Sequence, residues 1–138
     1  MRNQVQKTGR WYLLGFLCAL CVLCGESSSS AADPKKKVTY DEHVLPILKD
    51  KCVNCHSQDK KRGGLSLHTY VNLMQGGSSG MAVKPGDPEN SLLYRLVAHK
   101  QEPQMPPNSP KLPDETLAVV ERWIQGGALE NAGSKPVV

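Results

Sequence analysis

Large aromatic side chains are scarce in this chain of 138 residues, which has one Phe, two Trp and four Tyr. Beyond residue 32 only four remain, while that part of the chain holds nine Gly and ten Pro. With so few rings and so many loop-forming residues, the chain can bury little apolar surface. The free energy gained by this burial must offset a cost of about 1–2 kcal/mol for ordering each residue. The composition therefore predicts a small domain that folds around an additional group. The four rings are Tyr40, Tyr70, Tyr94 and Trp123.

A strong net charge of either sign is also missing. Residues 33–138 carry 14 Lys and Arg against 12 Asp and Glu, a formal charge of +2. This balance does not indicate binding to nucleic acid or to an anionic membrane. The lysines at 35–37 are predicted to lie in a flexible basic arm, residues 33–39, that precedes one small domain.

The chain has one long apolar run, and it is too short to span a membrane. Residues 1–10 carry three basic side chains, Trp11–Gly25 carries no charge, and small residues follow. A spanning helix needs roughly 20 apolar residues, whereas this order is typical of a secretory signal peptide. We predict a signal peptide over residues 1–32, cleaved after Ala32, and a periplasmic or otherwise exported protein that is soluble and has no stable membrane insertion after cleavage. An uncleaved signal anchor and a lipid anchor at Cys24 are the alternatives.

Three of the five cysteines lie in that apolar run, where they act as small hydrophobic residues. The other two stand in "KCVNCH" as Cys52 and Cys55, followed by His56. A closed zinc site needs about four protein ligands, and a thioredoxin-like site expects a preceding strand; neither pattern is present. In Cys-x-x-Cys-His, two thiols can bond to the porphyrin and the imidazole can bind its iron. The motif predicts one covalently attached haem c, with a thiol redox pair and another metal as alternatives.

Beyond residue 32 no segment alternates as a strand would and no repeat is visible, so an all-α fold of about four short helices is expected. The first helix precedes the cysteine motif. Thr39 and Glu42 have the spacing of a capping box at its start. Pro46 lies beyond the first turn, where a proline removes a backbone hydrogen bond, so the helix should bend or start later.

Three further segments have helical periodicity. The second helix should stop at Gly76, the third should begin with Asp87 as its N-cap, and the fourth should close at Gly126. The expected apolar positions are Leu67, Tyr70, Val71 and Met74 in the second helix, Leu92, Leu93, Leu96 and Val97 in the third, and Val120, Trp123 and Ile124 in the fourth.

Residues 40–130 contain the motifs Cys52–His56, Gly63–Leu65, Pro85–Pro88, Met105–Pro107, and Trp123–Ile124 before Gly-Gly-Ala. With these motifs the segment resembles the planctomycete-type cytochrome c domain, which belongs to the small monohaem c-type cytochromes. The resemblance implies a cytochrome c-like fold in which the first and last helices cross beside the haem. Trp123 is the predicted contact at this crossing, with a haem-propionate role as the alternative, and residues 131–138 are predicted to form a flexible tail. Leu65 and Leu67 are predicted walls of the haem pocket.

The second axial ligand of the iron decides what such a haem can do. Met105 stands in "EPQMPPNSP", where the prolines fix the backbone in a stiff, extended loop before the last helix. We predict Met105 as the ligand opposite His56, and the family's methionine ligand lies at the same place. Met74 is expected in the core, and Met81 lies in a glycine- and serine-rich loop that would position a ligand poorly. His99 and an open or water-filled site are the alternatives.

The remaining histidines are expected to be structural. His43 should be a solvated surface residue, and His68 should lie beside a turn. His99 should stabilise the C-terminal carbonyls of the third helix by charge or hydrogen bonding.

With His56 and Met105 both bound, the iron has no vacant position, which favours one-electron transfer over binding of a small molecule. We therefore predict an exported monohaem c-type cytochrome that exchanges electrons with redox partner proteins and is not an enzyme. The alternatives are a haem-based gas or redox sensor and a peroxidase-like enzyme with a labile distal ligand.

Overall fold

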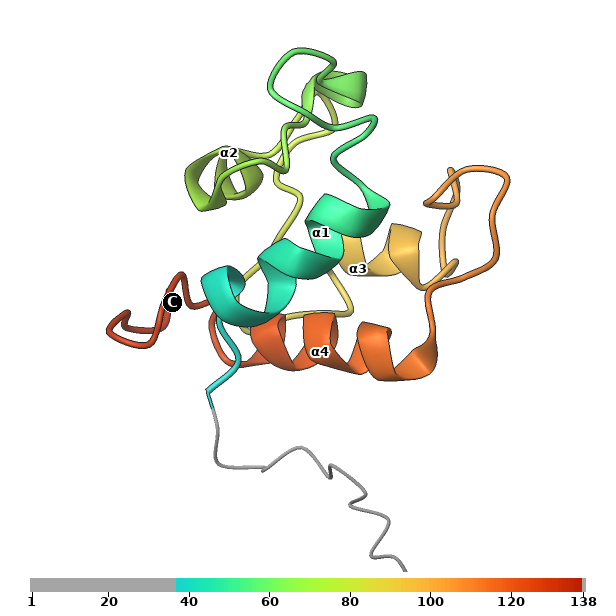
Figure 1. The fold of residues 1–138 in the computed structure, drawn as a ribbon. Helices are drawn as coiled ribbons and strands as arrows, with labels where there is room; N and C mark the ends of the chain where they lie inside the picture. The colour runs from blue at the N-terminus through green and yellow to red at the C-terminus, as the bar shows by residue number, and fades with distance from the viewer. Residues whose placement is uncertain (1–36, 138) are drawn as a thin grey trace, which may run out of the picture. The chain divides into compact units, whose positions relative to one another are not determined.

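The computed structural model describes residues 37–137. The predicted signal peptide and the first residues of the basic arm lie outside this range. Within it the chain forms four α-helices and two shorter helical segments and has no β-strand, so the predicted all-α class is confirmed (Figure 1). The segments are η1 (Tyr40–Val44), α1 (Leu45–Lys51), η2 (Arg62–Gly64), α2 (Tyr70–Gln75), α3 (Leu92–Val97) and α4 (Asp114–Gln125).

The first predicted helix consists of two segments, η1 and α1, that differ in hydrogen bonding. In η1 the N–H of Val44 donates to the carbonyl of Thr39 at 3.3 Å, and the N–H of Leu45 donates to the carbonyl of Tyr40. These bonds span five residues, as in a π-helical turn. Pro46 has no N–H, and its ring crowds the carbonyl four residues earlier. The wider turn makes room for this ring, and α1 starts only at Leu45, so the predicted bend or later start is confirmed.

The predicted capping box is wrong. The side chain of Thr39 makes no capping hydrogen bond. Instead, the N–H of Thr39 donates to Nδ1 of His43 at 3.2 Å, the bond that Glu42 would make in a capping box. His43 is therefore half-buried, with 24% of its side chain exposed, and is not the solvated residue that we expected.

Helix α2 ends as predicted, and its Tyr70 and Met74 pack against the core, but Leu73 rather than Val71 is enclosed. Its N-cap is Thr69, whose side chain accepts a hydrogen bond from the N–H of Asn72. Because the helix starts at residue 70, Leu73 falls on the buried stripe and is fully enclosed, whereas Val71 is 58% exposed. The prediction for Val71 is therefore wrong. Gly76 closes the helix with φ of 79°, and a side chain there would collide with the backbone of Gly80.

Helix α3 begins later than predicted. Its N-cap is Ser91, which is 1% exposed. Asp87 instead accepts hydrogen bonds from the backbone and side-chain N–H groups of Asn90, which fold residues 87–90 into a turn. Asp87 is thus a turn residue, and hydrogen bonds from Lys84 and Asn90 lower the pKa of its carboxyl group.

The two ends of the domain meet where η1 contacts α4. The rings of Tyr40 and Trp123 lie 6.2 Å apart, and Trp123 is fully buried with its Nε1–H donating to the carbonyl of Leu129 at 2.9 Å. Trp123 therefore occupies the predicted contact between the first and last helices. Tyr70 links α2 to the same region, because its hydroxyl donates to the carbonyl of Ala128 at 2.8 Å.

Tyr40 predicts how stability depends on alkaline pH. Burial raises the pKa of Tyr40 to about 12, and the charges of Asp41 and Glu130 add to the shift. An unfolded tyrosine has a pKa of about 10, so above that pH the unfolded chain loses a proton that the folded protein keeps. The contribution of protonated Tyr40 to the free energy of unfolding is therefore fully present below about pH 10 and is lost as the pH rises toward about 12.

Urea unfolding at increasing pH measures the effect. Tyr40→Phe should be less stable than wild type at neutral pH by about 1 kcal/mol, because the hydrogen bond from its hydroxyl to Leu67 is lost. Its free energy of unfolding should also decrease less than that of the wild type between about pH 10 and pH 12. Equal decreases in the two proteins would contradict the assignment to Tyr40.

Candidate functional site

The cysteine motif lies in a tight turn that leaves the end of α1. The N–H of Cys52 donates to the carbonyl of Leu48 at 2.8 Å, and the N–H of His56 donates to the carbonyl of Cys52 at 3.0 Å. The carbonyl of His56 then accepts from the N–H of Leu67 at 2.8 Å. The helix, the turn and the following segment therefore fix the backbone on both sides of the histidine.

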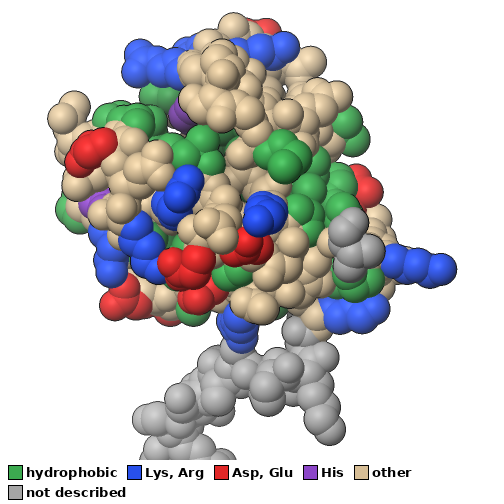
Figure 2. Space-filling view, turned by 180° about the vertical axis from the view of Figure 1, so that it is seen from behind, with side chains coloured by type: hydrophobic (Ala, Val, Ile, Leu, Met, Phe, Trp, Pro, Cys, Tyr) green, Lys and Arg blue, Asp and Glu red, His purple; other side chains and the backbone are tan. Residues whose placement is uncertain are grey.

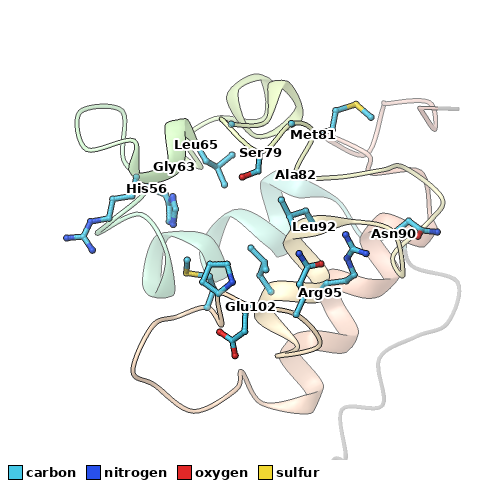
Figure 3. A pocket seen from close by; sticks show the side chains of 17 residues that line it. His56, Gly63, Leu65, Ser79, Met81, Ala82, Asn90, Leu92, Arg95 and Glu102 are labelled. Carbon is cyan, nitrogen blue, oxygen red and sulfur yellow. The ribbon is translucent and has the colours of Figure 1, made fainter.

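A cavity of about 500 Å³ opens beside this turn. This volume is in the range of pockets that hold cofactors. In Figure 2 hydrophobic side chains gather around a hollow in the upper left of the face, with a histidine beside it. Figure 3 shows His56 and Leu65 on one side of the cavity and Leu92 and Arg95 of α3 on the other.

Met105 lines the same cavity as His56. It is half-buried and packs against the core, and its N–H donates to the carbonyl of Leu96 at 3.1 Å. The loop that carries Met105 is therefore attached to α3. The two predicted iron ligands, which are far apart in sequence, come to one cavity, although their binding to iron stays a prediction.

The other methionines behave as the sequence indicated. Met74 packs against the core and is not among the residues that line the cavity. Met81 lies at the cavity rim with 66% of its surface exposed, and Figure 3 shows its side chain pointing away from the centre. Within the described part of the chain, Met105 is thus the methionine that both packs against the core and lines the cavity.

The other histidines lie outside the cavity. His68 is exposed, as expected for its position beside a turn. His99 does not line the cavity, and its Nε2 is buried without a hydrogen-bond partner in the described region. Nε2 therefore does not make the hydrogen bond to the C-terminal carbonyls of α3 that was one of the two expected contributions of His99, the other being its charge.

Cys52 and Cys55 are both half-buried, and no disulfide joins them. Burial raises the pKa of the Cys52 thiol to about 11, and the nearby Asp50 and Cys55 contribute further. A thiol redox pair works through a thiolate whose pKa is lowered. The shift at Cys52 has the opposite sign, which argues against the thiol redox alternative. No group of three or more His, Cys, Asp and Glu side chains suited to a metal ion is found within residues 37–137.

The residues around the cavity fit a haem held through the motif. Nδ1 of His56 is buried and has no hydrogen-bond partner in residues 37–137. The nonpolar side chains of Leu65, Leu92 and Leu96 line the cavity, as a porphyrin face requires. Cys52 and Cys55 form no disulfide and precede the histidine in the same turn, where thioether bonds to a porphyrin would form.

One predicted wall residue is wrong and others were missed. Leu65 lines the cavity as predicted, but Leu67 is 2% exposed, belongs to the core and is not among the lining residues. Leu92 and Leu96 were assigned only to the apolar stripe of the third helix, yet they face the cavity. The apolar stripe of Leu92, Leu93, Leu96 and Val97 is wide for so short a helix, which was the available signal that α3 serves two apolar environments.

A Cys-x-x-Cys-His turn and a methionine-bearing loop that line one cavity of an all-α domain are the arrangement expected of a c-type cytochrome. Residues 52–109 match the family described as Planctomycete cytochrome C. Over these residues the chain is similar to that family, and the match supports haem-based electron transfer with covalent haem c in general terms. Neither the curated proteins nor the solved structures gave a match. In the described part of the chain, no helix has the length and apolar character needed to cross a membrane.

Proposed function

We propose that this protein is an exported monohaem c-type cytochrome that carries single electrons between redox partner proteins. The observation that carries this proposal is that His56 of the Cys-x-x-Cys-His turn and Met105 line one cavity. When bound, the haem supplies reversible one-electron chemistry at its iron. The pattern of residues 1–32 supports export.

Each residue has a distinct role in this proposal. Cys52 and Cys55 would hold the porphyrin through thioether bonds, and His56 and Met105 would bind its iron. The backbones of both iron-binding residues are fixed, because the N–H of Leu67 donates to the carbonyl of His56 and the N–H of Met105 donates to the carbonyl of Leu96. An iron bound by these two side chains would supply one-electron transfer at a potential that the methionine raises.

Covalent attachment gives the direct test. After expression in a host that exports and matures c-type cytochromes, haem should remain with the polypeptide through acid-acetone extraction and denaturing electrophoresis. The expected mass is that of the mature chain plus one haem. Haem that passes completely into the organic phase, or a mass with two haems, would overturn the proposal.

A further inference from the structure

We propose that Arg95 binds a propionate carboxylate of the haem, an inference that rests on the proposed function. Arg95 lies in the last turn of α3 and lines the cavity. In Figure 3 it lies on the side of the cavity opposite His56. The sequence singled out no group for the polar edge of the cofactor except Trp123, whose indole N–H donates to the carbonyl of Leu129 instead.

The side chain of Arg95 is charged but has no counterion in the described region. Its Nε is buried without a hydrogen-bond partner, and none of the ion pairs within residues 37–137 includes it. A guanidinium stays charged at ordinary pH, and an unpaired charge beside a nonpolar cavity is costly. The arrangement therefore favours binding of an anion in the cavity.

The anion that fits is a carboxylate of the cofactor. A guanidinium can give a carboxylate two parallel N–H···O bonds, which are stronger than bonds between neutral groups. The other charged or titratable side chains that line the cavity are His56, Arg62 and Glu102. Glu102 is exposed, and its Oε2 accepts from the N–H of Gln104 at 3.1 Å rather than pairing with Arg95. Arg62 is exposed, so Arg95 is the half-buried cation of this cavity.

The test is the reduction potential of the haem-loaded full chain as a function of pH. It compares wild type, Arg95→Gln, Arg95→Lys and Arg122→Gln between about pH 4 and pH 8, where carboxylic acids titrate. Arg122 is a matched control because it is exposed on α4, binds the carbonyl of Ala118 and does not line the cavity.

In the wild type the guanidinium should keep the propionate ionised, so the potential should change little over this range. Arg95→Gln should have a lower potential at pH 8, because a positive charge that stabilises the ferrous state is lost. Its potential should also rise as the pH falls, because the released propionate then takes up a proton. Arg95→Lys should lie between the two, and Arg122→Gln should follow the wild type.

A profile of Arg95→Gln that superimposes on those of the wild type and Arg122→Gln would overturn the role of Arg95 while leaving the cytochrome assignment intact. A wild type without covalent haem would overturn both. If neither Arg95 variant retains haem, a crystal structure of the loaded wild type decides. A guanidinium nitrogen within hydrogen-bond distance of a propionate oxygen supports the proposal, and its absence from both propionates contradicts it.

Discussion

Met105→Ala is expected to convert a low-spin, six-coordinate haem into a high-spin ferric haem at neutral pH. The alanine has no sulfur to bind iron, so the distal position opens and the reduced variant should bind carbon monoxide. The sulfur-to-iron charge-transfer band of the oxidised wild type should disappear completely. Visible spectra of the oxidised and reduced proteins, with and without carbon monoxide, measure the change.

Met74 and Met81 provide matched controls for this experiment. Met74→Leu and Met81→Leu should keep the charge-transfer band, because Met74 packs against the core and Met81 is exposed at the cavity rim. A band that survives Met105→Ala but is lost in either control would assign the ligand to another sulfur. Met105 would then be only a wall of the cavity.

Replacement of both Cys52 and Cys55 by Ala should leave little folded protein. Without covalent attachment the cavity of about 500 Å³ loses its occupant. The nonpolar side chains that the porphyrin would cover, Leu65, Leu92 and Leu96, are then left exposed to water, which is unfavourable. Far-ultraviolet circular dichroism and the yield of soluble protein report the loss.

Asn54→Ala is the matched control for the double cysteine variant. Asn54 lies within the same motif and is exposed, and both thiols are retained. This control should fold and carry haem with nearly the wild-type yield. A double cysteine variant that unfolds as cooperatively as this control would show that the domain does not depend on the cofactor for its core.

The strongly periodic segments were predictable because their apolar spacing fits an amphipathic helix and no other element. Helix α4 has its apolar residues on one stripe, acids in its first turn and glycines at its end, and it forms from Asp114 to Gln125. The positions of local polar contacts were harder to predict. Ser91, rather than Asp87, occupies the N-cap position of α3, and the aspartate is engaged in a turn with Asn90. His43 replaces Glu42 in accepting the N–H of Thr39 because η1 is more widely wound than an α-helix.

The residues proposed to bind the cofactor were predictable because residue type and covalent chemistry identify them. The residues that line the cavity were less predictable because packing determines which side chains face it. The Cys-x-x-Cys-His spacing identified His56, and the proline-rich loop identified Met105; the structure brings both to one cavity. Leu67 was assigned to that cavity but enters the core. An apolar pattern states that a side chain leaves water, but it does not distinguish a protein core from a cofactor. Arg95 could not be singled out from the sequence, because only the structure shows that its charge has no partner among the described side chains.

The most direct measurement of the central assignment is the visible spectrum of the purified wild-type protein, oxidised and then reduced under carbon monoxide. Ligation by His56 and Met105 predicts a low-spin ferric spectrum with the sulfur-to-iron band and no change when carbon monoxide is added to the reduced protein. A high-spin ferric spectrum without that band, or ready binding of carbon monoxide, would contradict the account of this protein as a six-coordinate electron carrier.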